Sequence, residues 1–210
     1  MGRPLYAILL DGGFLTKKLY EKLGRHATVD DIVHECERVQ TLPELSSYEL
    51  LRIYYYDAPP SSESVLRAVS RTRLNLASTE RFRLSQSLYD LLVLKPHFAL
   101  RMGETRLSPN RWRIKPQIAK RLVTTPRSLT DEDFDLDLSQ KGFDMRIGLD
   151  MARLALRETV RAVVVLTGDS DFVPAFKFAR REGMKVFLDP MGPPRRVVAD
   201  CGPWRFRFQL

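Results

Sequence analysis

The chain has 210 residues, of which 44% are hydrophobic, and this is enough for one domain with a full core. No apolar run is long enough to span a membrane, and the short run near the N-terminus lacks the cleavage pattern of a signal peptide. The two cysteines, Cys36 and Cys201, exclude a disulfide framework and favour a cytoplasmic protein.

The formal net charge of +8 is concentrated in the middle of the chain. Residues 61–127 contain 14 lysines and arginines against 4 aspartates and glutamates, whereas the rest of the chain contains 20 against 22. A basic segment of this kind predicts a polyanionic partner such as RNA. The alternative is an arginine-rich surface that contacts only solvent.

The first quarter of the chain alternates between a strand pattern and helix patterns. Leu5–Leu10 is a short apolar run that predicts a buried parallel strand. Helical spacing follows over Phe14–Leu23 and Thr28–Leu42, which end at a glycine and at a proline. Leu51–Tyr56 is rich in aromatic and branched residues and predicts a second strand.

The basic middle segment has weaker patterns. Ser61–Leu92 predicts two helices, and Leu94–Lys115 alternates between turn signals, which predicts a β-hairpin or small meander. Ile118–Asp133 predicts a loop. Phe134–Leu138 alternates apolar and acidic residues and predicts a short exposed strand that leads into the next helix.

The last third returns to alternating helices and strands. Gly142–Glu158 is apolar on nearly all sides and predicts a well-buried helix. Ala162–Thr167 and Met184–Leu188 predict buried strands, and they flank a helix over Phe172–Arg181. The terminal Cys201–Leu210 alternates aromatic residues with arginines and predicts an edge strand or a contact in a homodimer.

This alternation predicts an α/β protein, a three-layer α/β/α sandwich with a central, mostly parallel sheet and helices on both faces. We expect a single domain over residues 1–210, with a basic helical and β-hairpin insertion at about 61–130. In such sheets, ligands bind outside the carboxyl ends of the strands.

Aspartates follow the predicted strands at their carboxyl ends. Four strands lead into Asp11, Asp57, Asp169 and Asp189, and parallel strands would gather these residues along one rim. Grouped carboxylates stay ionised only if a cation offsets their charge, and Mg²⁺ and Mn²⁺ prefer oxygen ligands. Each aspartate taken alone is equally explained by a helix cap or a turn.

Other chemistries lack their motifs. The three histidines are scattered and have no zinc-site spacing, and no phosphate-binding glycine loop or nucleophile elbow is present. A phosphatase with an aspartyl nucleophile would need an acid at position 13, where Gly13 stands.

Three blocks of sequence resemble the NYN domains of the bacterial LabA-like (DUF88) group, which are related to PIN nucleases. The blocks are Ile8–Phe14 (ILLDGGF), Lys141–Met151 (KGFDMRIGLDM) and Val165–Pro174 (VLTGDSDFVP). They occur in the family's order and bracket almost the whole chain, but the segment 61–130 has no specific match. Many PIN-like proteins carry an asparagine three residues after the first aspartate, and this chain has Phe14 there.

The resemblance implies a PIN-like fold and metal-dependent ribonuclease activity with Mg²⁺ or Mn²⁺. It implies that Asp11, Asp144 and Asp169 are the metal-binding acids and that Asp171 is a fourth. Lys141 and Ser170 are candidate contacts to the substrate. Asp150 also matches the family pattern, but it lies about 600° of helix from Asp144 and therefore on another side of the helix, where a supporting role is expected. Asp57 and Asp150 form a secondary acidic rim.

The first hypothesis is an endoribonuclease in which a water oriented by Asp171 attacks a phosphodiester, and the resemblance implies a 5′-phosphate product. The basic segment would guide the RNA, with four arginines as candidate contacts and Trp112 either stacking on a base or packing in the core. These arginines are Arg101, Arg106, Arg111 and Arg113. The second hypothesis is a PIN-like module that binds RNA or a protein without cutting, and the third is a phosphatase for small metabolites.

Overall fold

The computed structural model describes residues 2–192, except for the side chains of residues 109, 110, 140, 141, 143 and 144. The chain divides into two compact units, each of which is described by itself. The sheet unit comprises Met1–Asp57, Leu88–Met102 and Gly142–Leu210, and the ribbon unit comprises Ala58–Ser87 and Gly103–Lys141. The predicted edge strand or dimer contact at Cys201–Leu210 lies outside the described residues.

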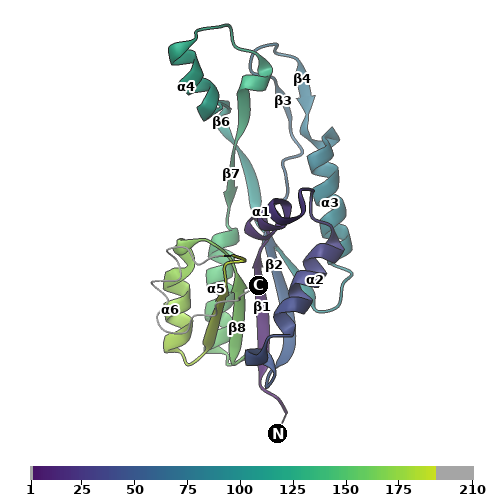
Figure 1. Ribbon diagram of the computed structural model, residues 1–210, viewed down its shortest axis with the longest axis vertical. Coiled ribbons are helices and arrows are strands. Elements are labelled where there is room, and N and C mark those ends of the chain that lie inside the picture. The colour runs from purple at the N-terminus through teal and green to yellow at the C-terminus, as the bar shows by residue number, and fades with distance from the viewer. Residues whose placement is uncertain (1, 193–210) are drawn as a thin grey trace. The chain divides into compact units, whose positions relative to one another are not determined.

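The sheet unit is built on five parallel strands (Figure 1). Their order across the sheet is β5-β2-β1-β8-β9, and all four pairings between neighbours are parallel. The strands are β1 (Leu5–Asp11), β2 (Glu49–Asp57), β5 (Phe98–Met102), β8 (Ala162–Leu166) and β9 (Lys185–Asp189). The predicted α/β architecture with a central parallel sheet is therefore confirmed.

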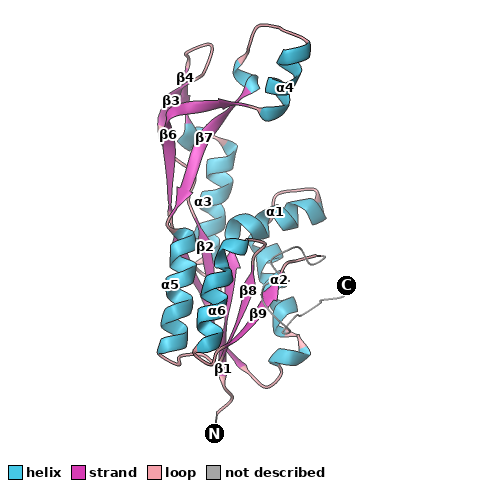
Figure 2. Cartoon of the chain, turned by 90° about the vertical axis from the view of Figure 1, so that its left-hand side faces the viewer, coloured by secondary structure: helices cyan, strands magenta, loops and turns pink. Residues whose placement is uncertain are grey.

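Helices cover both faces of this sheet. On one face α5 (Phe143–Leu156) and α6 (Val173–Arg181) lie side by side, as Figure 2 shows, and share an apolar core with β1, β2, β8 and β9. On the other face α1 (Gly12–Leu23), α2 (Val29–Gln40) and the end of α3 (Glu80–Leu92) enclose a second core. Successive residues of β1 enter opposite cores, so both of its faces are buried. This explains why the sequence shows continuous apolar runs in place of alternation.

Local signals in the sequence set the ends of the helices. Thr28 and Asp31 form a reciprocal capping box at the start of α2. Gly24 ends α1 with a φ of 68°, a left-handed conformation that glycine adopts without a steric cost. The predicted helices in the first quarter of the chain thus agree with the structure within two residues at each end.

The ribbon unit is antiparallel. Its long ribbon pairs β6 (Glu104–Ile114) with β7 (Phe134–Lys141), and a short hairpin pairs β3 (Ser64–Leu66) with β4 (Arg73–Asn75). The indole N–H of Trp112 donates a 2.7 Å hydrogen bond to the carbonyl oxygen of Leu66 and so joins the ribbon to the hairpin. Trp112 is partly buried at this contact.

Three predictions for the basic segment are wrong. Ser61–Leu92 contains the β3–β4 hairpin and one helix, α3, where two helices were expected, and α4 (Pro116–Thr124) lies in the predicted loop. Leu94–Lys115 is not a hairpin, because β5 joins the parallel sheet and β6 pairs with β7. Trp112 faces Leu136 across the ribbon, and alternation along one strand does not indicate so distant a partner.

The expectation that α5 is buried on nearly all sides is also wrong. Ile147, Met151 and Leu154 are buried in the core, whereas Leu149 and Leu156 are more than half exposed. In the described part of the chain this helix packs mainly on α6 and the sheet, and leucines on its outer side are exposed. Within residues 2–192, no helix combines the length and the hydropathy that crossing a lipid bilayer requires.

Two leucines near the end of α5 test this assignment of faces. Leu154 is 2% exposed and Leu156 is 62% exposed. Leu154→Ala should lower the free energy of unfolding by about 2–5 kcal/mol, because it removes buried methyl groups and leaves a cavity. Leu156→Ala is the matched control and should change it by about 0.5 kcal/mol or less. Urea denaturation followed by circular dichroism measures both values, and equal losses would contradict the orientation of α5.

Candidate functional site

The carboxyl ends of the central strands lie along one edge of the sheet. The register pairs Asp11 at the end of β1 with Tyr56 of β2, and it pairs Leu10 with Leu166, the last residue of β8. Neighbouring strands lie about 4.8 Å apart. The residues that follow β1 and β8, which are far apart in sequence, are therefore close neighbours in space.

Asp11 is the most buried acid at this edge after Asp189 and is 7% exposed. It caps α1, because its Oδ1 accepts a 3.0 Å hydrogen bond from the backbone N–H of Phe14. Its Oδ2 accepts a 3.0 Å hydrogen bond from the hydroxyl of Thr167, which is fully buried. Two elements, the first turn of α1 and the end of β8, thus fix both carboxylate oxygens.

Thr167 connects Asp11 to Asp169. Its hydroxyl oxygen accepts a 3.2 Å hydrogen bond from the backbone N–H of Asp169 while its proton goes to Asp11. Sequence reasoning did not single out Thr167 as a functional residue. The available signal was a polar residue that directly follows the fully apolar strand β8.

Burial raises the pKa of Asp11 above its usual value, and the charges of Asp57 and Asp169 raise it further. The hydrogen bonds from Phe14 and Thr167 act in the opposite direction. Ionised Asp11 is therefore in an unfavourable environment, chiefly because it is buried, and a cation at this edge would stabilise its charge.

Asp169 caps the helix that follows it. Its Oδ1 accepts a 2.9 Å hydrogen bond from the backbone N–H of Asp171 at the start of a 3-10 helix, Ser170–Phe172. The carbonyl oxygen of Ser170 accepts the backbone N–H of Val173, so this turn leads directly into α6. Asp169 is partly exposed, and Ser170 and Asp171 are exposed, in contrast to Asp11.

Two glycines allow close packing around Asp11. A Cβ on Gly12 would lie 2.7 Å from the phenol of Tyr55 and 2.8 Å from the carbonyl oxygen of Tyr56, so a side chain there would push α1 off β2. A Cβ on Gly168 would lie 2.5 Å from the ring of Phe14. The aromatic ring of Phe14 therefore lies directly on the backbone between Thr167 and Asp169.

Asp57 is held by two tyrosines. Its Oδ2 accepts hydrogen bonds from the phenols of Tyr89, at 3.1 Å, and Tyr55, at 3.3 Å. Burial, followed by the charge of Asp57, raises the pKa of Tyr55 well above its usual value. The phenol thus remains protonated and continues to donate to the carboxylate.

Asp150 lies in α5 and faces β2 and β5. It accepts hydrogen bonds from the phenol of Tyr56 and the guanidinium of Arg101, both at 3.0 Å, and it also pairs with Arg153. Arg101 lies 5.2 Å above the ring of Tyr54. Arg101 is therefore part of the central sheet, where it is bound to protein groups, and not on a hairpin with the other candidate arginines.

Asp189 is neutralised by a cation from α2. Its carboxylate forms an ion pair with Arg38, whose guanidinium also binds Glu35 at 2.6 Å. The other carboxylate oxygen of Asp189 accepts a 2.8 Å hydrogen bond from the backbone N–H of Met191. Asp189 shares the edge with Asp11, as the sequence predicted for the strand ends, but its charge is already compensated.

The remaining candidate residues lie elsewhere or outside the described part. Asp144 lies in the first turn of α5 and Lys141 ends β7, and the side chains of both are outside what the structure describes. In the ribbon unit, Arg106 pairs with Glu104 at 2.8 Å. Arg111 and Arg113 are both exposed. Asp135 lies opposite Arg113 across the ribbon.

The donors at the sheet edge suit a magnesium-type ion. Among the side chains that the structure describes, no three His, Cys, Asp or Glu residues are grouped closely enough to hold a metal by themselves. Mg²⁺ requires only one or two carboxylates, since water and substrate phosphate supply its other ligands. Asp11 and Asp169, two acids whose charges act on each other, fit that requirement.

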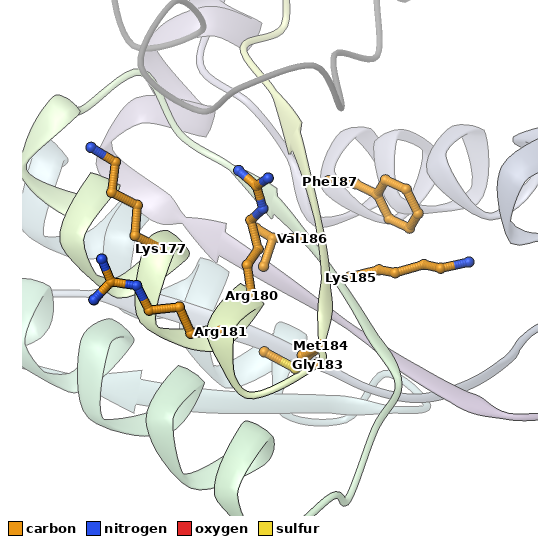
Figure 3. A pocket seen from close by; sticks show the side chains of 8 residues that line it. All are labelled: Lys177, Arg180, Arg181, Gly183, Met184, Lys185, Val186 and Phe187. Carbon is orange, nitrogen blue, oxygen red and sulfur yellow. The ribbon is translucent and has the colours of Figure 1, made fainter.

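A basic groove lies at the start of β9, away from Asp189 at the end of that strand. It has a volume of about 480 Å³ and is lined by Gly183, Met184, Val186, Phe187 and four cationic residues (Figure 3). The cations are Lys177, Arg180, Arg181 and Lys185. Because Lys185 begins β9 and Asp189 ends it, the groove is separate from the acidic edge. The positive charge at the end of α6 also complements its helix dipole.

Comparison with known proteins gives one family and one solved structure, and no curated protein matches the chain. The chain is similar to a crystal structure of a protein of unknown function from Vibrio parahaemolyticus, with a TM-score of 0.49 and 16% sequence identity. That similarity covers 99% of this chain and 94% of the other. Residues 113–201 match the NYN domain family, and this stretch contains Asp144, Asp169 and Asp171 but not Asp11.

Proposed function

We propose that the protein is a metal-dependent endoribonuclease whose acids lie at the carboxyl edge of the central sheet. The observation that carries the proposal is the hydroxyl of Thr167, which donates to the carboxylate of Asp11 and accepts the backbone N–H of Asp169, so that the two acids lie side by side. A fold gains no stability from holding like charges together, so such an arrangement favours a role in binding a cation. The match of residues 113–201 to the NYN domain supports the same conclusion. The three sequence blocks that resemble the LabA-like group favour that group.

Asp11, Asp169 and Asp144 are the residues that would hold Mg²⁺ or Mn²⁺. When bound, such an ion offsets the carboxylate charges and stabilises negative charge that develops on the scissile phosphate. Asp171 is exposed next to Asp169, where its carboxylate accepts a hydrogen bond from the attacking water and orients it. Attack of the water oxygen on phosphorus breaks the bond to the 3′-oxygen, which leaves a 5′-phosphate and a 3′-hydroxyl.

The ribbon unit supplies the contacts to the RNA backbone in this proposal. Thirteen of its residues are lysine or arginine and eight are aspartate or glutamate. Several of the acids are engaged within the unit, for example Asp133, which accepts two hydrogen bonds from Arg127. The exposed Arg111 and Arg113 are therefore the strongest candidates for binding phosphates, together with Arg106. Lys141 and Ser170 are candidate contacts near the scissile phosphate.

Cleavage of single-stranded RNA in Mn²⁺ tests the activity. Asp11→Asn and Asp169→Asn should each reduce the cleavage rate by more than the 10–100-fold that is roughly typical for outer partners of a metal site. Asp144→Asn should do the same. Asp30→Asn is the matched control, because the side chain of Asp30 is 87% exposed on α2, and it should cleave at the unmutated rate. RNA binding without any cleavage that a chelator removes would favour a binding module, and turnover of a phosphomonoester with intact RNA would favour a phosphatase.

Thermal denaturation with and without Mn²⁺ tests the charge at Asp11. Since the folded state raises the pKa of Asp11, its ionisation is destabilising, and this destabilisation appears as the pH rises from the unfolded-state pKa through the raised pKa. Asp11→Asn should therefore raise the Tm of the metal-free protein at neutral pH but not at acidic pH, and asparagine still caps α1. Mn²⁺ should raise the Tm of the unmutated protein and not that of the variant. An equal response to Mn²⁺ in both proteins would place the ion elsewhere.

The salt dependence of RNA affinity tests the ribbon unit. Replacing Arg111 and Arg113 by alanine should lower affinity for RNA of any sequence, because contacts to phosphate carry no sequence information. The slope of log K against log salt concentration should fall by roughly 0.7 for each phosphate that the variant no longer neutralises. Arg161→Ala is the control, since Arg161 pairs with Glu158 at 2.8 Å in the sheet unit. An unchanged slope in the double variant would show that these arginines do not bind the backbone.

A further inference from the structure

We propose that Phe14 is a stacking platform for one base of the nucleic acid, so that the acidic edge accepts unpaired nucleotides and rejects a continuous duplex. This inference rests on the proposed binding of RNA at Asp11 and Asp169, and it adds the class of RNA that the site selects. The position of one aromatic ring and the groups around it support the inference.

The backbone and the ring of Phe14 contact the two sides of the acidic edge. Its backbone N–H donates to the Oδ1 of Asp11 at 3.0 Å. Its ring covers Gly168, where an added Cβ would lie 2.5 Å, 3.1 Å and 3.4 Å from three ring carbons. Gly168 directly precedes Asp169. A nucleotide whose phosphate is bound through a cation at these acids would therefore have its base or sugar beside this ring.

Phe14 is not needed to fill either apolar core. Leu15 and Leu19 of the same helix belong to the core formed with α2 and β1, whereas Phe14 belongs to neither core and remains partly exposed. The ring packs on the bare backbone of Gly168 at the acidic edge and not among the side chains of a core. The ring lies against Gly168, and the backbone of Phe14 is bonded to Asp11 in the first turn of α1.

An aromatic ring of this kind distinguishes single strands from duplexes. Every base has a π face, so stacking on phenylalanine tolerates any sequence, but a base inside a duplex is already stacked on both sides. Flipping such a base out of the helix costs unstacking energy. A ring next to the phosphate site thus favours single-stranded RNA, loops and ends.

Equilibrium binding in Mn²⁺ tests the proposal without cleavage when every variant also carries Asp171→Asn, since Asp11, Asp144 and Asp169 would still hold the ion while the attacking water is no longer oriented. The ligands are a short fluorescent single-stranded RNA and the same strand in a duplex, with affinities measured by anisotropy. Phe14→Ala should weaken binding of the single strand about tenfold and leave binding of the duplex unchanged. Phe14→Trp should keep the affinity for the single strand, because tryptophan also offers a ring for stacking. Phe178→Ala is the matched control, because Phe178 is a 37% exposed phenylalanine on α6, and it should change neither affinity.

A second variant tests the same ring without removing it. Gly168→Ala places a methyl group where the ring of Phe14 lies, and Gly168 has no positive φ that would make alanine strained. It should weaken binding of the single strand as Phe14→Ala does. Adding Gly168→Ala to Phe14→Ala should cost nothing further, since the ring that it displaces is already absent.

Fluorescence of 2-aminopurine in the single strand gives an independent signal. Stacking quenches this base, so the non-cleaving protein that retains Phe14 should lower its emission at one position, and the same protein with Phe14→Ala should not. Equal losses of affinity for single strand and duplex, or no loss with either variant, would overturn the stacking role. Selective binding of single strands, with no cleavage by the protein that retains Asp171, would uphold the stacking role while refuting the nuclease. If single-stranded RNA is cleaved, and Phe14→Ala and Gly168→Ala leave its cleavage unchanged, the nuclease would be upheld and the stacking role refuted.

Discussion

The acidic edge depends on one constraint, the parallel pairing of β1 with β8. This pairing brings Asp11 and Asp169 together although they lie far apart in the sequence. Thr167 then links them, because its single hydroxyl donates to one acid and accepts from the backbone of the other. Asp11 carries the electrostatic cost, since burial and the neighbouring charges raise its pKa. The rest of the sheet unit holds this unfavourable group in position.

Burial of apolar residues on both faces of the sheet provides the opposing stabilisation. The strands carry side chains into two cores, and helices close each core. Gly12 and Gly168 let α1 and the loop after β8 approach the acidic edge more closely than a Cβ would allow. The sheet unit thus holds in place a buried acid whose ionised form a cation would stabilise. This is the relation between stability and binding that a metal site is expected to have.

Acids with similar positions at the same edge serve different purposes because they have different partners. Asp189 ends β9 but binds Arg38, and Asp57 ends β2 but accepts hydrogen bonds from two tyrosines. Asp150, in α5, binds Arg101. Each of these carboxylates already has a donor or a cation from the protein. Asp11 also accepts two hydrogen bonds, but burial together with the charges of Asp57 and Asp169 still raises its pKa, so a cation would stabilise its ionised form.

The sequence by itself determined the central architecture and the ends of most of its elements. Continuous apolar runs such as β8 are typical of strands buried on both faces, and caps such as Thr28 and Gly24 act within one turn of chain. Only the tertiary structure decided which acids meet, which one Arg38 neutralises, and that Phe14 covers Gly168. It also decided that β5 joins the parallel sheet and that β6 pairs with β7. These features depend on contacts between segments far apart in the chain, whereas patterns of residues reflect only a segment's own periodicity and its immediate neighbours.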